Sequence, residues 1–176
     1  MDRLPEPLTT FKEFVEADLR RAARLIIKIQ DEIDPQFRIS TPDGDYWLAV
    51  TLPADTGDRK QMLRRVSTFM AWKQAVGFTL ASELMVPDCV YCIGMTHREV
   101  HACLARITRT PRPWMKKNFG PVEWIDRQQI GPEMLELLPR GSRSIDKREL
   151  EMLEKWFGVA GRFPAVHVGS GEVRGV

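Results

Sequence analysis

The chain has 176 residues, a length that suits one domain. Hydrophobic residues make up 43% of it and charged residues 28%, values that are ordinary for a globular protein and exclude the disordered and fibrous classes. The formal net charge of +2 is too small to indicate a nucleic-acid partner by itself, so any electrostatic argument has to be local.

The sequence carries no sign of export or of membrane insertion. No apolar run approaches the ~20 residues that span a bilayer. The segment 1–7 is charged and broken by prolines, unlike a signal peptide. Three cysteines are an odd number, which favours a reducing compartment over a disulfide framework. The sequence therefore predicts a cytoplasmic protein with no membrane contact, and its motifs indicate no cofactor.

The first predicted element is a long amphipathic helix over 10–33. Thr10 and Glu13 have capping-box spacing, and apolar residues follow at helical spacing. Pro35 ends the helix because the residue before a proline avoids helical geometry. Several cations lie off the apolar stripe and are interpreted as a solvated face: Arg20, Arg21, Arg24 and Lys28.

A hairpin and a second helix follow. Two β-prone runs, 37–40 and 46–52, flank a Pro-Asp-Gly turn, the pattern of a β-hairpin. The second helix is predicted over 57–76, where Gly77 is well placed to end it.

Two strands and a short helix are predicted next. The run 78–84 alternates like a strand, and the apolar run 89–95 suits a strand that is covered on both faces. Thr96 and Glu99 repeat the capping-box spacing and predict a short helix that extends to about Ile107.

The last third is predicted to hold a loop, a strand, two helices and an edge strand. The segment 108–120 contains prolines and a glycine and is predicted to be a loop, and 121–125 a strand. A helix begins at Pro132, where the missing N–H costs nothing. Ser144 is predicted to cap the last helix, and 163–168 to form an edge strand.

These elements define an α+β fold, in the order α-β-β-α-β-β-α-β-α-α. We expect a mixed or mainly antiparallel sheet of about five strands with helices packed on one face. The segment 1–168 is predicted to be a single domain, and 169–176 a flexible tail.

One segment is unusually basic. Between positions 101 and 120 there is no acidic residue, and the cations and their aromatic neighbour are Arg106, Arg109, Arg112, Trp114, Lys116 and Lys117. Cations of this kind neutralise phosphates, and an exposed indole can stack on a base. With cations of the second helix (Arg59, Lys60, Arg64 and Arg65) they predict a polyanion-binding face. In the alternative interpretation Trp114 folds onto the core and the loop is purely structural.

A second cluster resembles a zinc site in its residue types: Cys89, Cys92, His97, His101 and Cys103. Positions 89 and 92 of an extended strand point to opposite faces, so they cannot share a metal without a local turn. His97 and His101 are four residues apart on the predicted helix and would share a face. We expect buried, apolar cysteines and no bound metal.

Three residues are candidates for acid–base chemistry. Glu83 would lie on a central strand, on the face opposite Leu84, where burial would raise its pKa. Asp88 in the turn after that strand and the nearby His97 are its candidate partners. In the alternative, Glu83 is an ordinary glutamate that faces solvent.

Three functions follow from these patterns. The first is a non-catalytic binding or regulatory protein that contacts nucleic acid or an acidic protein through the basic loop. The second is a small hydrolase or transferase that uses Glu83 with His97 or Asp88. The third is a structural or assembly module, a homo-oligomer in which Trp156 and Phe157 of the last helix dock a second copy.

Overall fold

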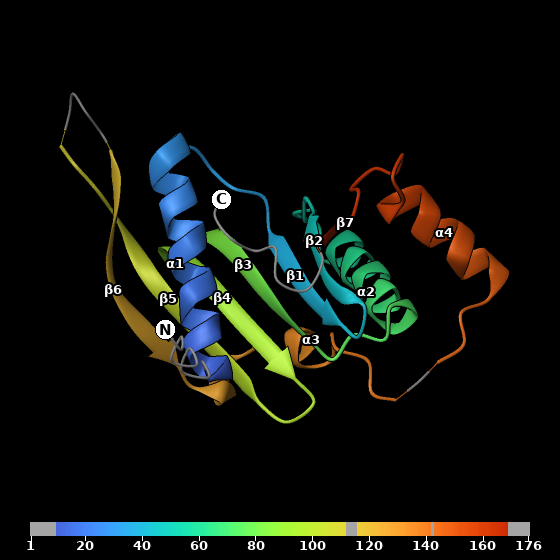
Figure 1. Cartoon of the computed structure of the whole chain (residues 1–176). Coiled ribbons are helices and arrows are strands. Elements are labelled where there is room, and N and C mark those ends of the chain that lie inside the picture. The colour runs from blue at the N-terminus through green and yellow to red at the C-terminus, as the bar shows by residue number, and fades with distance from the viewer. Residues whose placement is uncertain (1–9, 112–115, 142, 169–176) are drawn as a thin grey trace, which may run out of the picture.

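The computed structural model describes residues 10–111, 116–141 and 143–168. Within them, seven strands form one sheet in the order β6-β5-β4-β3-β1-β2-β7, and every pairing is antiparallel (Figure 1). The strands are β1 (Gln36–Thr41), β2 (Gly44–Ala49), β3 (Gly77–Met85), β4 (Asp88–Thr96), β5 (Val100–Arg109), β6 (Lys117–Ile125) and β7 (Val166–Val168). The helices are α1 (Phe11–Ile29), α2 (Thr56–Trp72), α3 (Pro132–Leu135) and α4 (Lys147–Phe157), with a 3₁₀ turn, η1 (Arg127–Gln129).

Helix α1 begins where the sequence predicts. Thr10 Oγ1 accepts from the Glu13 N–H at 3.2 Å, and the Glu13 carboxylate accepts from the Thr10 N–H at 2.9 Å, which completes the capping box. The helix ends at Ile29, four residues before the predicted end, because Gln30 adopts the left-handed conformation (φ 54°).

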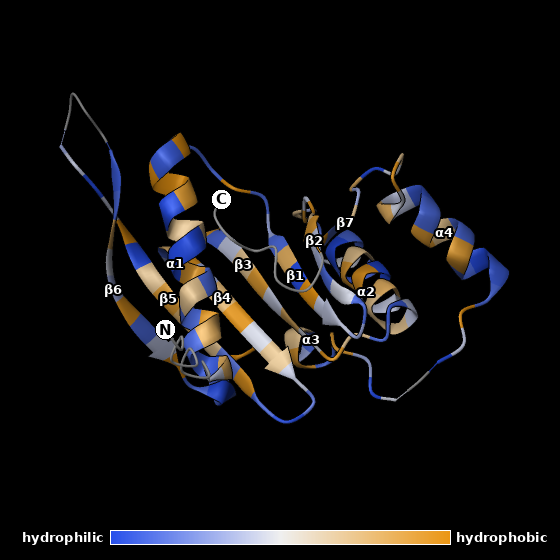
Figure 2. Cartoon of the chain, in the orientation of Figure 1, coloured by the Kyte–Doolittle hydropathy of each residue, from blue (hydrophilic) through white to orange (hydrophobic). Residues whose placement is uncertain are grey.

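The sheet separates two cores, and helices cover both of its faces. On one face the buried side of α1 packs against small residues of β4 and β5, among them Val90, Cys92 and Cys103. On the other face α2, α3 and α4 enclose a larger core that includes Phe69 of α2 and the strand residues Phe37, Leu48 and Phe78. The helices carry hydrophobic and hydrophilic stripes side by side, as amphipathic helices on a sheet do (Figure 2). The predicted one-sided arrangement is therefore wrong, and the α+β class is confirmed.

A glycine lets α1 approach the sheet closely. A Cβ atom on Gly94 of β4 would lie 2.3 Å from Val15 Cγ2 and 3.0 Å from Phe11 Cζ, which is too close for either contact. The register of β4 under α1 therefore depends on the missing side chain at this position.

The helix predicted after Thr96 is a strand. Thr96 Oγ1 accepts from the Arg98 and Glu99 N–H groups, both at 3.2 Å, and closes the β4–β5 turn instead of capping a helix. From Val100 onward the chain pairs with β4 and then with β6, and these pairings override the local pattern.

Other differences are smaller. Strand β6 begins at Lys117, inside the predicted loop, and β7 completes a sheet of seven described strands in place of about five. Asp146, not Ser144, caps α4 and exchanges hydrogen bonds with Glu149 at 2.8 and 3.1 Å. The predicted flexible tail, 169–176, lies outside the described residues. In the described part of the chain, no helix is both long and apolar enough to cross a bilayer.

Candidate functional site

The predicted basic loop belongs to the β5–β6 hairpin. The last β5 residue that pairs with β4 is Arg106, opposite Cys89, whereas β5 continues to Arg109 and β6 begins at Lys117. The described end of this hairpin therefore extends past β4 and lies beside the last turn of α1, as Figure 1 shows at the upper left. Arg112 and Trp114 lie outside the described residues.

Most of the described cations of this hairpin are paired with carboxylates. Arg106 Nε lies 3.1 Å from Glu123 Oε2, on the solvent-exposed surface. Arg109 pairs with Asp88. Lys116 is exposed.

The third pair, Lys117 with Glu83, is buried. Lys117 Nζ lies 2.9 Å from Glu83 Oε1, and the two side chains are only 11% and 4% exposed. Gln30 at the end of α1 accepts a hydrogen bond from the Lys117 N–H at 2.8 Å. These contacts tie the loop end of the hairpin, where β6 begins, to β3 and to α1. The expectation of free cations at positions 106, 109 and 117 is therefore wrong.

The structure does not join the hairpin to the cations of α2. Helix α2 packs on the face opposite α1, against residues of β1 and β2 such as Phe37 and Leu48, and the hairpin lies at the other edge of the sheet (Figure 1). Lys60 approaches Glu133 at 3.7 Å, Arg59 is half-buried and Arg64 is exposed.

Arg65 instead joins residues that sequence analysis did not connect with it. Its Cζ lies 4.0 Å from the centroid of the Trp156 ring on α4. Arg162 Cζ lies 5.1 Å from the same ring and 5.5 Å from that of Phe163. Among the described residues neither arginine has a carboxylate partner. We call Arg65, Trp156 and Arg162 the α2–α4 stack.

The backbone around Trp156 fixes the stack. The Phe163 N–H donates to the Trp156 carbonyl at 2.7 Å, so the chain after α4 turns back beside the indole. Phe157, the next residue, packs edge-on against Phe69 of α2 with centroids 5.5 Å apart and is 3% exposed. Because Phe157 is part of the core, its side chain is not available to contact a second copy, and of the two residues predicted to dock one only Trp156 remains.

The acid–base candidates do not form one centre. Glu83 and Asp88 lie near the β3–β4 turn, and each carboxylate faces its own cation. One oxygen of each, Glu83 Oε2 and Asp88 Oδ1, is buried without a hydrogen-bond partner among the described residues. His97 is in the turn after β4, at the opposite end of the β3–β4 pair, so the structure does not bring it to Glu83.

The cysteines are buried on a two-sided sheet. Cys92 and Cys103 are direct cross-strand neighbours beneath α1, and Cys89 lies on the other face of β4. Burial, followed by the charge of Glu16, raises the pKa of the Cys103 thiol to about 12, and burial holds the pKa of Cys92 well above its usual 9.0. Burial also raises the pKa of Cys89.

The histidines do not complete a metal site with these thiols. His101 is on β5, 2.6 Å from the Glu99 carboxylate, and not on a helix face shared with His97. The described residues contain no group of three or more side chains that could hold a metal ion.

A cleft in the described part of the chain lies elsewhere. Its volume is about 510 Å³, and it opens between the end of α2 and the segment that leads into α4. It is lined by residues that include Trp72, Gln74, Val76, His97, Arg143 and Leu150. Of the predicted acid–base residues only His97 lines this cleft. Arg143 already forms an ion pair with Glu149, so the polar groups of the cleft do not form a catalytic arrangement.

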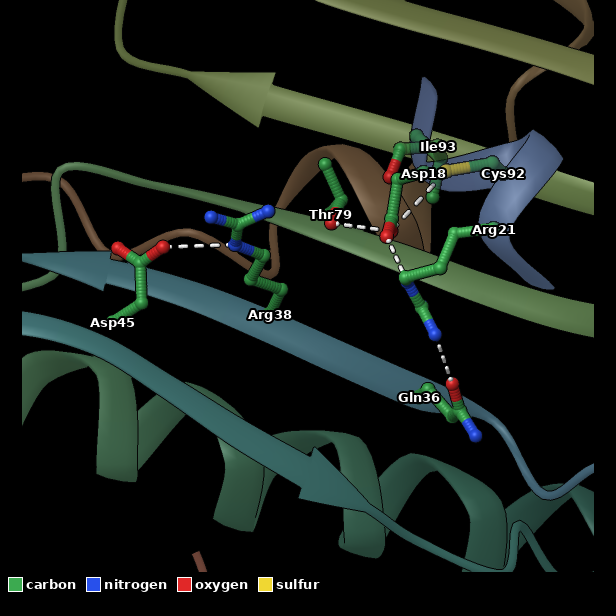
Figure 3. A network of polar contacts seen from close by, with 8 residues as sticks. All are labelled: Asp18, Arg21, Gln36, Arg38, Asp45, Thr79, Cys92 and Ile93. Atoms are coloured by element: carbon green, nitrogen blue, oxygen red, sulfur yellow. Dashed lines mark hydrogen bonds and ion pairs between the residues drawn. The ribbon is translucent and has the colours of Figure 1, made fainter. Parts of the chain in front are cut away.

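Two further arginines, Arg21 and Arg38, lie in a polar network beside α1 (Figure 3). Asp18 of α1 accepts hydrogen bonds from Thr79 Oγ1 and from Arg21 Nε, each at 2.7 Å. Arg38 of β1 donates through Nε to Asp45 Oδ2 at 2.8 Å. Both guanidinium groups lie against the ring of Trp47, with Cζ-to-centroid distances of 4.4 Å for Arg21 and 5.6 Å for Arg38.

The described residues form an α+β chain with one antiparallel sheet and two arginine–tryptophan contacts, one between α2 and α4 and one beside α1. The chain matches no protein-family model, no curated protein and no solved structure. Its function is therefore argued from its own residues.

Proposed function

We propose that this protein is a non-catalytic binding protein for a polyanionic partner and that the α2–α4 stack makes the principal contact. One observation carries the proposal. Arg65 and Arg162 are ordered on a single indole, and within the described residues no carboxylate neutralises either of them. Arg64, one position before Arg65 on α2, adds an exposed cation.

Stacking prepares an arginine for anion recognition. A guanidinium group that lies on an aromatic ring keeps the N–H groups of its edge free, and these match phosphate or carboxylate oxygens in pairs. The ring also restricts the side chain before binding, so less conformational entropy is lost in the complex. An arginine already paired with a carboxylate, such as Arg106, would first have to exchange that partner.

The geometry favours contacts to phosphate groups over contacts to bases. Trp156 is only partly exposed and has arginines against its ring, so its faces do not offer a platform for an unpaired base. Phosphate contacts are independent of sequence and weaken steeply with salt. We therefore expect binding to nucleic acids with little sequence preference.

Fluorescence anisotropy with labelled single-stranded DNA, double-stranded DNA and RNA, at about 50 and 200 mM salt, tests the proposal. The double variant R65Q/R162Q should bind at least tenfold more weakly and should lower the magnitude of the slope of log K against log salt by about 1.4 to 1.8, as two lost phosphate contacts require. The matched control is R24Q, an exposed arginine of α1 outside both surfaces, which should bind as the wild type does. Wild-type binding that is absent or insensitive to salt would refute the proposal.

The hairpin is a second candidate contact. Its end extends past β4, and Lys116 there is exposed. A triple variant, R112Q/W114A/K116Q, tests it in the same assay. If the hairpin contributes, this variant binds several-fold more weakly than the wild type. An affinity equal to the wild type assigns the function to the α2–α4 stack alone.

A further inference from the structure

We propose that Arg21, Arg38 and Trp47 form a second and separate site, which binds a carboxylate side chain of an acidic peptide segment. We call it the α1–β1 site. It lies on the face of the sheet that carries α1, beside that helix, at β1 and β2 (Figure 3). The proposal does not depend on the α2–α4 stack, which lies on the opposite face with α2.

Arg21 is held in place by buried groups. Asp18, whose side chain is 2% exposed, fixes Nε of Arg21 and is itself fixed by the Thr79 hydroxyl. Nη1 donates to Gln36 Oε1 at 3.0 Å. Nη2 is buried and has no hydrogen-bond partner among the described residues. A buried N–H group without an acceptor is costly, so a ligand oxygen that reached it would be bound favourably.

Arg38 presents a similar open edge. Its Nε is taken by Asp45, and its Cζ lies 4.6 Å from the Phe14 centroid and 5.6 Å from that of Trp47. In the described part of the chain, its two terminal nitrogens have no acceptor. The ring contacts and the aspartate together leave one edge of the guanidinium group for a further oxygen pair.

Side chains of α1 partly cover this part of the sheet face, because Arg21 lies against Trp47 and Phe14 lies against Arg38, whose side chain is 16% exposed. Helix α1 packs against β3, β4, β5 and β6, and α2 lies on the other face (Figure 1). Val166 of β7, the register partner of Trp47, is 58% exposed and continues the surface. Residues directly opposite each other on paired strands share a face, so an apolar contact is available next to the arginines.

The charge of the site selects a carboxylate over a polyanion. Arg21 and Arg38 are balanced by Asp18 and Asp45, so the four formal charges cancel. A neutral surface gives a polyphosphate little long-range attraction. Directed N–H donors still match one planar carboxylate at short range. The 510 Å³ cleft lies elsewhere, and the exposed Val166 continues the site along β7, so an extended peptide fits it better than an enclosed small molecule.

Titration with a fluorescein-labelled decapeptide that carries one glutamate among alternating leucine and serine residues, at about 150 mM salt, tests the proposal, and the same peptide with glutamine in place of the glutamate is the probe control. We expect saturable binding of the glutamate peptide and at least tenfold weaker binding of the glutamine peptide. Equal binding of the two peptides, or no binding of the glutamate peptide, overturns the proposal.

Three variants locate the contact. R38Q should weaken binding of the glutamate peptide at least tenfold, and D45N should strengthen it several-fold because it removes a competing carboxylate. R65Q/R162Q should bind the peptide as the wild type does, which separates this site from the proposed function. If R38Q does not fold, R38K decides, since it keeps the charge but loses the paired N–H groups and should bind at least threefold more weakly. Wild-type affinity in folded R38Q or R38K, or a D45N variant that binds no more tightly, contradicts the assignment.

Discussion

Asp18 of α1 and Thr79 of β3 form a hydrogen bond of 2.7 Å in the interface between helix and sheet, where Asp18 is 4% and Thr79 1% exposed. The same carboxylate holds Arg21, so one buried acid links the position of α1 to that of the α1–β1 site. Substitution of one polar group in this network therefore measures how much that group contributes to the stability of the helix–sheet interface.

Replacement of Thr79 by valine removes the hydroxyl donor and leaves Asp18 Oδ2 with only the weak thiol contact of Cys92 at 3.9 Å. We expect T79V to lower the free energy of unfolding by about 1 to 2 kcal/mol, the usual cost of a buried acceptor that loses its partner. Urea denaturation measures it. T79S keeps the hydroxyl and is the control, with a smaller loss. A T79V protein as stable as the wild type would show that the bond contributes nothing.

Replacement of Gly94 by alanine should disturb the packing of α1. The new methyl group would meet Val15 and Phe11 at distances that neither can accept without movement of the helix. We expect a loss of about 1 to 3 kcal/mol in the free energy of unfolding. G120A on β6, where the nearest atom is 3.8 Å from the new Cβ, is the matched control and should be nearly neutral. Equal effects of the two substitutions in thermal or urea denaturation would contradict the close approach of α1.

Replacing only Lys117 of the buried Lys117–Glu83 pair should lower the free energy of unfolding more than replacing both residues. K117M leaves the Glu83 carboxylate buried without its cation, and we expect a loss of about 3 kcal/mol. The double variant E83Q/K117M should recover most of that loss. R106Q removes an exposed pair and should change the free energy of unfolding by less than about 1 kcal/mol. Additive single effects of E83Q and K117M in a double-mutant cycle would argue against the pair.

The buried thiols should be unreactive in the folded protein. Burial raises the pKa of Cys103 from 9.0 to about 12, so at pH 9 about one thiol in a thousand is ionised, against about half in the unfolded chain. Alkylation by iodoacetamide at pH 9 should therefore be slow until denaturant is added. Rapid modification of Cys103 in the native protein, located by mass spectrometry, would contradict its buried position.

The same shifts predict how stability depends on pH. Below pH 9 both the folded and the unfolded chain keep the proton of Cys103. Between pH 9 and about 12 the unfolded chain loses it first, so the folded state binds more protons and its stability falls as pH rises. Burial likewise raises the pKa of Tyr91 from 10.0 to about 12, which adds to the decline above pH 10. Urea midpoints measured from pH 8 to pH 11 should decrease, and C103S should flatten the decline.

Local patterns predicted the elements whose partners are close in sequence. The capping box at Thr10 and the turn between β1 and β2 depend on a few adjacent residues, and both are where the sequence indicates. The Thr96–Glu99 spacing failed because the same side-chain oxygen can cap a helix or close a hairpin turn. Pairing with strands on both sides decided between them.

The sites were less accessible to sequence analysis. A two-residue turn after Thr41 sets the register that places Arg38 opposite Trp47, so half of the α1–β1 site could have been found from the hairpin alone. The contact of Arg65 with Trp156 depends on how α2 packs against α4, and that of Glu83 with Lys117 joins β3 to β6, which have β4 and β5 between them in the sheet. No spacing in the chain encodes these distances.

The place of β7 in the sheet has a consequence during synthesis. His167 contacts the backbone of Asp43 across 124 residues of chain, whereas β3, β4 and β5 each pair with the next strand along. When β6 has left the ribosome, the described strands from β1 to β6 have all been synthesised and can pair, but β2 still has an unpaired edge. Until the last strand emerges, that edge is open to wrong partners, and a chaperone that covers it would act at this stage.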